Sequence, residues 1–422
     1  MLNVHSGRLI LFLLLLAPAG SGYSVLTHEA IIDSAWDDSI RPVLLQRFPS
    51  ATPDEMRKAH AYAYGGAIIQ DLGYYPFGSR FFSDLVHYVR SGDFILHLLV
   101  DAQDLNELAF ALGALAHSAA DDQGHSIATN RAVADLYPKL RAKYGNTVSY
   151  EDDPVAHLKV EFGFDVSQVA HNHYAPDAYH SFIGFEVSKP LLQRAFRETY
   201  DLEFDSMFLS VDLALGSYRR TVSGLIPLMT KVAWSSKRQE IEALTPGVTR
   251  HKFIYNLSRA SYRRDWGKDY KEPGVGAKFL AFLFRILPKV GPLRSFQFQP
   301  LNAQTEKLFA QSFNSTLDKY RVLLKDAQAG KVKLPNTNFD TGKPVLAGEY
   351  RLTDEAYAKL LDKLASNKFE GLEPELRRNI LDFYAHAVGP VSTKSKPADW
   401  EKLQKQLHEL ENESILGKEK AN

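Results

Sequence analysis

Residues 105–125 read LNELAFALGALAHSAADDQGH. Apolar side chains recur at helical spacing through the first part of this stretch, which predicts an α-helix. Residues four apart project from one face of a helix, so His117 and Asp121 can bind one metal ion together. His125 lies a further four residues along the chain. If the helix continues that far, Asp121 stands between two imidazoles, and such a carboxylate can bridge two ions.

The stretch HLKVE at residues 157–161 repeats this spacing with His157 and Glu161. Either pair taken singly also fits a capped or salt-bridged helix face, but the two pairs together indicate a metal site. Neutral imidazole and carboxylate are the ligands expected of zinc, and a catalytic zinc keeps one position open for water. Asp122 is an alternative ligand that ranks below Asp121.

Two further candidates lie upstream, Asp71 in IIQDLGYYP and His87 in DLVHYV. Gly73 and Pro76 predict a loop after Asp71, and a carboxylate on a loop suits a ligand that also accepts a proton. An ordinary turn aspartate and a buried core histidine are the alternative interpretations. His97 is the substitute if His87 is not a ligand.

Composition excludes several kinds of site. The 422 residues include no cysteine, which rules out disulfides, thiolate ligands and a cysteine nucleophile. The GxSxG motif of serine hydrolases and the GxxxxGK[ST] motif of P-loop proteins are both absent. His28 and Glu29 could begin an HExxH protease motif, but Ile32 stands where the second histidine belongs. Lys+Arg and Asp+Glu are balanced at 50 each, which counts against a dedicated nucleic-acid binder.

The N-terminus has the pattern of an export signal. A short basic start precedes the apolar run Leu9–Ala17, and the small residues Gly20–Gly22 follow it. This predicts a cleavable signal peptide at 1–22 and a secreted or periplasmic protein that begins at Tyr23. The run is too short to span a bilayer, so the mature protein is expected to have no transmembrane segment. His28 would lie close to the freed α-amino group.

The expected fold is all-α, a multi-helix domain followed by a C-terminal helical extension. A capping box at Thr52–Glu55 predicts a helix that runs towards Ile69. Further helices are predicted where apolar residues recur at helical spacing, at 105–116, 133–143, 154–162, 191–198, 301–324, 353–364 and 374–387. Histidines thin out after His180, which places a boundary near residue 235, between a catalytic domain at 23–235 and an extension of unknown role at 236–422.

Other candidates receive simpler interpretations. His171 and His173, with His180 nearby, favour polar packing over a further metal cluster, because HxH ligands need strand or loop geometry. The apolar segment 277–287 favours a core helix over a helix that lies on a lipid surface.

As an ordered set, these residues resemble the zinc-dependent phospholipase C family, whose fold is shared by single-strand-specific nucleases of fungi and plants. The resemblance covers Tyr23 to Glu198. It implies up to three zinc ions. The first ion would be held by Asp71, His87, His117 and Asp121, and the second by His125, His157 and Glu161. The third would be held by the amino and carbonyl groups of Tyr23, by His28 and by a bridging Asp121.

The resemblance implies that phospholipid at a membrane surface is cleaved to diacylglycerol and a phosphorylated head group, with Asp71 orienting the attacking water and accepting its proton. Glu161 at the end of the second set is more typical of the phospholipases than of the nucleases. A nuclease or phosphomonoesterase on the same scaffold is one alternative, and an exported, non-catalytic, metal-stabilised binding protein is another. The oligomeric state is not predicted.

Three positions depart from the family pattern. Tyr23 stands where the family has tryptophan, the gap from Asp121 to His125 is shorter, and the gap from Asp71 to His87 is slightly longer.

Overall fold

The computed structural model of the protein describes residues 24–171, 185–221, 301–385 and 397–419 and the isolated positions 234, 238, 239, 242, 247, 249, 250, 387 and 389. Five predictions fall outside the described residues: the signal peptide, Tyr23, the apolar segment 277–287, His173 and His180. Within the described part the chain is mostly helical and has only two short strands, which confirms the all-α prediction.

The helices of the first half are α2 (Val25–Ala35), η1 (Trp36–Ile40), α3 (Arg41–Arg47), α4 (Pro53–Ile68), η2 (Ile69–Tyr74), α5 (Arg80–Tyr88), α6 (Ser91–Asp101), α7 (Leu105–Gln123), η3 (Gly124–Thr129), α8 (Asn130–Leu136), α9 (Pro138–Tyr144), α10 (Pro154–His171), α12 (Lys189–Tyr200), η4 (Phe204–Met207) and α13 (Val211–Arg220). The second half contributes α18 (Ala303–Gln328), the short strands β1 (Thr337–Asn338) and β2 (Lys343–Pro344), α19 (Arg351–Ser366), α20 (Pro374–Tyr384) and α21 (Pro397–Glu419). None of the described helices is both long and apolar enough to cross a membrane.

Local sequence signals explain where several helices begin and end. The Thr52 side chain accepts a bond from the backbone of Glu55 and completes the predicted capping box at the start of α4. The helix predicted over 133–143 is instead two helices, α8 and α9, because Pro138 disfavours a helical conformation at Tyr137.

Helices α4 and α7 cross with their backbones in close contact at two glycines. A Cβ atom at Gly66 would lie 1.9 Å from the carbonyl oxygen of Phe110, and one at Gly113 would lie 2.0 Å from that of Ala63. Only hydrogen fits at both positions. This approach brings the C-terminal end of α4 beside the His117 turn of α7.

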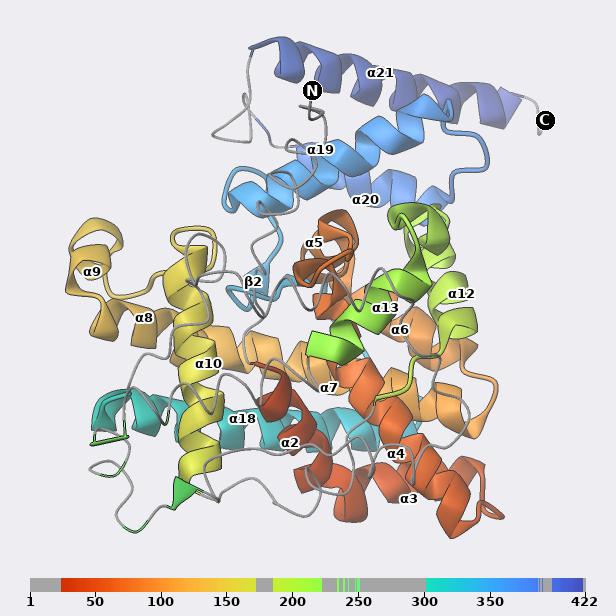
Figure 1. Cartoon of the computed structure of the whole chain (residues 1–422). Helices are drawn as coiled ribbons and strands as arrows, with labels where there is room; N and C mark the ends of the chain where they lie inside the picture. Colours follow the sequence, from red (N-terminus) through yellow and green to blue (C-terminus); the bar gives the residue numbers. More distant parts are fainter. Residues whose placement is uncertain are drawn as a thin grey trace, which may run out of the picture.

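The second half of the chain packs on two sides of the first (Figure 1). Helix α18 lies along α7 and η3, where the Tyr320 hydroxyl donates to the carbonyl of Leu112 at 2.9 Å. Helices α19, α20 and α21 lie together at the opposite end, where α19 contacts α5. Strands β1 and β2 form an antiparallel hairpin in which Thr337 pairs with Pro344. The division near residue 235 stays a prediction.

The start of α2 is tied to α10 by one buried carboxylate. Asp165 accepts bonds from the backbone N–H groups of Leu26 and Thr27, both at 3.0 Å, and from the Thr27 hydroxyl at 2.6 Å. The first N–H groups of a helix have no acceptor in a preceding helical turn, and the Asp165 carboxylate supplies acceptors to two of them at the start of α2. His28 follows directly and is held in place by the same contact.

Asp165→Ala should therefore lower the free energy of unfolding, and the loss should depend on pH. Burial raises the pKa of Asp165 from 3.8 to about 6, although its hydrogen bonds oppose the shift. The folded state thus favours the protonated carboxyl, so the stability it contributes is full below the unfolded pKa and declines as the pH rises through about 6. The difference between wild type and variant should shrink by about 3 kcal/mol from about pH 4 to about pH 8. Urea unfolding at several pH values measures it, and a difference independent of pH would contradict it.

Candidate metal centre

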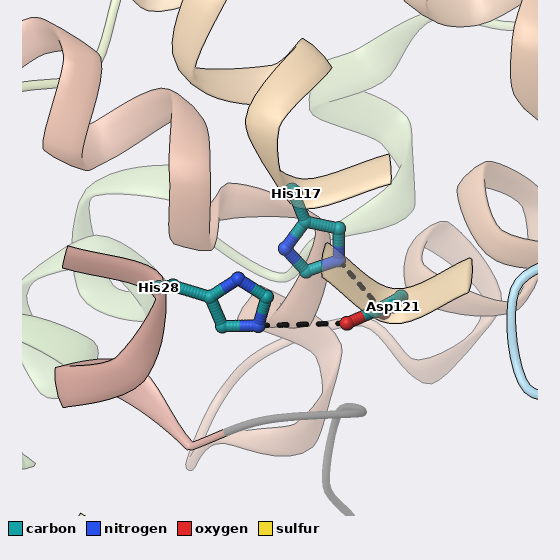
Figure 2. A group of neighbouring side chains, drawn as sticks. All are labelled: His28, His117 and Asp121. Carbon is teal, nitrogen blue, oxygen red and sulfur yellow. Dashed lines mark ion pairs between the residues drawn. The ribbon is translucent and has the colours of Figure 1, made fainter. Parts of the chain in front are cut away.

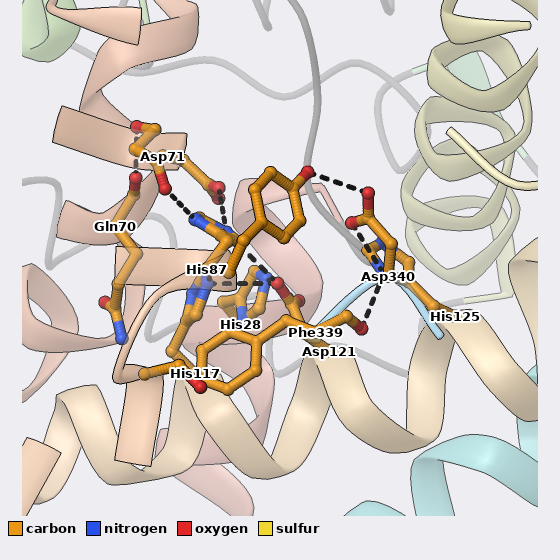
Figure 3. A network of polar contacts seen from close by, with 12 residues as sticks. His28, Gln70, Asp71, His87, His117, Asp121, His125, Phe339 and Asp340 are labelled. Atoms are coloured by element: carbon orange, nitrogen blue, oxygen red, sulfur yellow. Dashed lines mark hydrogen bonds and ion pairs between the residues drawn. The ribbon is translucent and has the colours of Figure 1, made fainter. Parts of the chain in front are cut away.

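Three groups of buried histidines and carboxylates could each hold a metal ion. In each group the ligand atoms lie within 4.8 Å of one another, and every member is at most 2% exposed. The groups are His28, His117 and Asp121; Asp71, His87 and His117; and His125, His157 and Glu161. The structure therefore brings together every predicted ligand that it describes, and most of them can be followed in Figure 3.

His117 and Asp121 lie at the centre of the site. They are one turn apart on α7, so their side chains project from the same face of the helix. The distance from His117 Nε2 to Asp121 Oδ2 is 3.1 Å. Helix α7 does continue past Gly124, but as the wider π-helix η3. This change of helix type, common at functional sites, turns His125 towards Glu161, with His125 Nε2 3.7 Å from Glu161 Oε1.

Asp71 and His87 reach the centre from η2 and α5. His87 Nε2 lies 3.5 Å from Asp71 Oδ1 and 3.4 Å from Asp121 Oδ2. The turn that carries Asp71 is fixed by the Ser83 hydroxyl, which accepts from the backbone of Gly73 at 2.9 Å. Asp71 is thus held in a buried 3₁₀ helix that follows α4, where the sequence predicted a loop.

His28 lies on the other side of Asp121. Its ring stacks on that of His117 with centroids 4.5 Å apart, and its Nε2 lies 3.5 Å from Asp121 Oδ1 (Figure 2). Asp121 therefore faces His28 with one oxygen and His87 and His117 with the other, which is the arrangement expected of a bridging carboxylate.

In four of the imidazoles, one ring nitrogen bonds to the protein and the other points into the site. His87 Nδ1 faces the Ser83 carbonyl and His117 Nδ1 faces the Ala67 carbonyl, both at 2.8 Å. A carbonyl only accepts, so each Nδ1 carries the proton and each Nε2 keeps its lone pair for a metal.

The same rule holds in the third group with different partners. His125 Nδ1 donates to the Phe339 carbonyl at 2.9 Å, which leaves Nε2 towards Glu161. His157 Nε2 donates to Asn130 Oδ1 at 2.9 Å, which leaves Nδ1 2.7 Å from Glu161 Oε1.

The electrostatics show how strongly the buried groups affect one another. Burial and the neighbouring His117 lower the pKa of His28 to about 4. Burial opposes protonation of His87, yet the adjacent Asp121 and Asp71 raise its pKa well above the usual value. Burial also raises the pKa of Glu161 well above its usual range. A dication among these groups would replace such protons, since it favours neutral imidazole and ionised carboxylate.

The residues fit zinc on two observations. Zinc bonds of about 2.0–2.1 Å in a tetrahedron place neighbouring ligand atoms about 3.3 Å apart, and the five distances of the central groups are 3.1, 3.4, 3.4, 3.5 and 3.5 Å. Both Asp121 oxygens are buried without a hydrogen bond of normal geometry in the described part of the chain, as are Glu161 Oε1 and His125 Nε2. Burying such atoms is costly unless a cation contacts them.

The lower-ranked candidates lie elsewhere. The Asp122 carboxylate forms an ion pair with Lys319 and belongs to none of the three groups. His97 Nδ1 lies 2.8 Å from the Thr199 hydroxyl, so it does not replace His87. No inference from the sequence included Asn130, Phe339 or Asp340, which contact the site; the last two lie more than two hundred residues after His125, where no local pattern connects them to it.

The comparison with protein families confirms the resemblance over one segment. A family model described as zinc dependent phospholipase C matches residues 27–209, a range that includes all eight described ligand candidates. Searches of curated proteins and of solved structures found no significant match.

Proposed function

We propose, from the zinc dependent phospholipase C match of residues 27–209 and from the buried ligand groups, that the protein is an exported zinc phosphodiesterase that acts on phospholipids as a phospholipase C. The observation that carries the proposal is the geometry at Asp121. This carboxylate lies between His28 on one side and His87 and His117 on the other, at ligand-to-ligand spacings that suit zinc.

The proposed ligand sets follow the three groups. Asp71, His87, His117 and Asp121 would hold one zinc ion, and His125, His157 and Glu161 a second. Tyr23, through its amino and carbonyl groups, would hold a third with His28 and Asp121. Bound zinc would supply Lewis-acid activation of water and stabilise negative charge on the phosphoryl oxygens.

The chain's own residues would handle the proton. Asp71 lies at the edge of the central group, its Oδ1 accepts no hydrogen bond from the described residues, and the oxygen faces His87 at 3.5 Å. In this role Asp71 would orient the attacking water and accept its proton as phosphorus is attacked in line. The bond between glycerol oxygen and phosphorus would then break, and the glycerol oxygen would take up the proton held by Asp71 to give diacylglycerol and a phosphorylated head group.

Phospholipid is favoured over nucleic acid by the burial of the nearby aromatic rings. Tyr74 lies 5.8 Å from His87 and Tyr150 lies 5.7 Å from His157, between ring centroids, and both are at most 3% exposed. Stacking of unpaired bases needs accessible aromatic faces. Among the residues that the structure describes, the aromatic rings nearest the metal groups have no accessible face for stacking.

Incubation of the zinc-loaded protein with phosphatidylcholine vesicles and, separately, with single-stranded DNA tests the substrate class. We expect release of diacylglycerol and phosphocholine and no shortening of the DNA. Turnover of DNA alone would replace the lipase proposal with the nuclease alternative. Zinc binding without turnover of phosphatidylcholine, anionic phospholipid vesicles, DNA or a phosphomonoester would favour the non-catalytic alternative.

Asp71→Asn should lower kcat by about 10²–10⁴-fold, because the amide cannot accept the proton from water. The matched control is Asp122→Asn, which changes another buried aspartate that pairs with Lys319 instead of a ligand group. Initial rates on phosphatidylcholine, with zinc content measured for each variant, make the comparison. Equal loss in both variants would count against a chemical role for Asp71.

Binding of the third zinc ion would depend on export, because only cleavage before Tyr23 would free the α-amino group. Protein that begins at Tyr23 should contain one more tightly bound zinc ion per chain than protein with extra residues before it. Elemental analysis after dialysis measures the difference. The same zinc content in both forms would remove the terminal amine from the ligand set.

A further inference from the structure

A hairpin from the second half of the chain enters the metal centre. Strands β1 and β2 are joined by a tight turn whose first two residues, Phe339 and Asp340, are each 2% exposed. The Phe339 backbone N–H donates to the carbonyl of His87 at 3.2 Å, and its ring packs edge-on against the His87 ring. Figure 3 shows both hairpin residues beside the histidines.

The Asp340 carboxylate faces the ligand candidate His125. Its Oδ1 lies 3.2 Å from His125 Nδ1, the nitrogen that also donates to the Phe339 carbonyl. Its Oδ2 accepts from the Tyr88 hydroxyl at 2.8 Å and from the Tyr350 hydroxyl. Two tyrosines therefore hold Oδ2 of the carboxylate, while Oδ1 faces the imidazole of His125.

The hairpin also reaches the second histidine of this group, through Asn130. The Asn130 amide donates to the backbone carbonyl of Asp340 at 2.8 Å. Because its nitrogen is used in this way, its oxygen must be the atom that accepts from His157 Nε2. The turn at Asp340 thus sets the orientation of both imidazoles that face Glu161.

We propose that Asp340 is a positioning residue for the zinc ion at His125, His157 and Glu161, an inference that rests on the zinc proposal above. A carboxylate opposite the protonated nitrogen of a ligand histidine fixes its tautomer and ring orientation and makes the other nitrogen a stronger donor. Turn aspartates are ordinarily exposed. Burial of this one is explained by the three donors around it, one of which is the ligand imidazole.

Zinc affinity, measured by competition with a chelator and elemental analysis, tests the proposal without any lipid substrate. Asp340→Ala should weaken binding of one ion about 10- to 100-fold and leave the others unchanged. Asp340→Asn keeps an oxygen that can accept from His125 Nδ1, so it should recover part of this loss. The absorption spectrum of the cobalt-substituted protein should change in Asp340→Ala, which altered stability alone would not cause.

Asp354→Asn is the matched control. Asp354 is a buried aspartate 14 positions farther along, accepts from the backbone of Gly348 at 2.9 Å, and belongs to none of the ligand groups. Wild-type zinc affinity and an unchanged cobalt spectrum in the Asp340 variants would overturn the inference. Equal loss in Asp354→Asn would overturn it too, as the effect would then be general. If Asp340→Ala does not fold, the nearly isosteric Asp340→Asn must show the weaker affinity and altered spectrum, or the inference fails.

The two proposals fail separately. A wild-type protein that binds zinc but cleaves no phospholipid would contradict the lipase proposal and leave the role of Asp340 intact. Phospholipase activity in a protein whose zinc affinity does not depend on Asp340 would support the lipase proposal and contradict the role of Asp340.

Discussion

Eight ionisable side chains lie buried together in the interior, and the cost of burying them constrains the rest of the structure. Each is at most 2% exposed. Buried carboxylates and imidazoles are unfavourable unless charge is compensated and every remaining polar atom has a partner. Five imidazoles and three carboxylates cannot all satisfy one another by hydrogen bonds, and several of their atoms do not. The arrangement fits a set of ligands for which a cation would be the partner.

The helices are arranged so that this partner can be surrounded from several directions. The glycine crossing of α4 and α7 lets the Ala67 carbonyl reach His117 Nδ1. A residue with a Cβ at either glycine would push the two helices apart and break that bond. The π-helix that follows α7 then separates His125 from Asp121, so that one continuous stretch of chain contributes ligand candidates to all three groups.

The second half of the chain contributes contacts to a metal centre whose described ligand candidates all lie in the family-matched segment. The match ends at residue 209, yet the Phe339 carbonyl accepts a hydrogen bond from the His125 ring and α18 lies along α7 and η3. Rigid orientation of ligands matters because an imidazole that rotates freely must be ordered when the metal binds. The hairpin contributes that order from a distant part of the chain.

Local patterns in the sequence were sufficient for the helical fold and for the two ligand pairs that each lie on one helix. Each of these signals lies within one helix and can be recognised without knowing what packs against that helix. They are the apolar spacing of α7, the capping box at Thr52 and the two ligand pairs four residues apart. The expected grouping of the remaining histidines and acids came instead from the resemblance of the ordered set to the zinc-dependent phospholipase C family.

Tertiary structure alone decided the rest. The break at Tyr137 is an exception, because it has a local cause in Pro138. The π-helix redirects His125, and the hairpin brings Asp340 to the His125 ring. Both depend on packing between distant segments. A hydrogen bond between residues more than two hundred positions apart leaves no periodic trace in either segment, because the partner only has to be close in space.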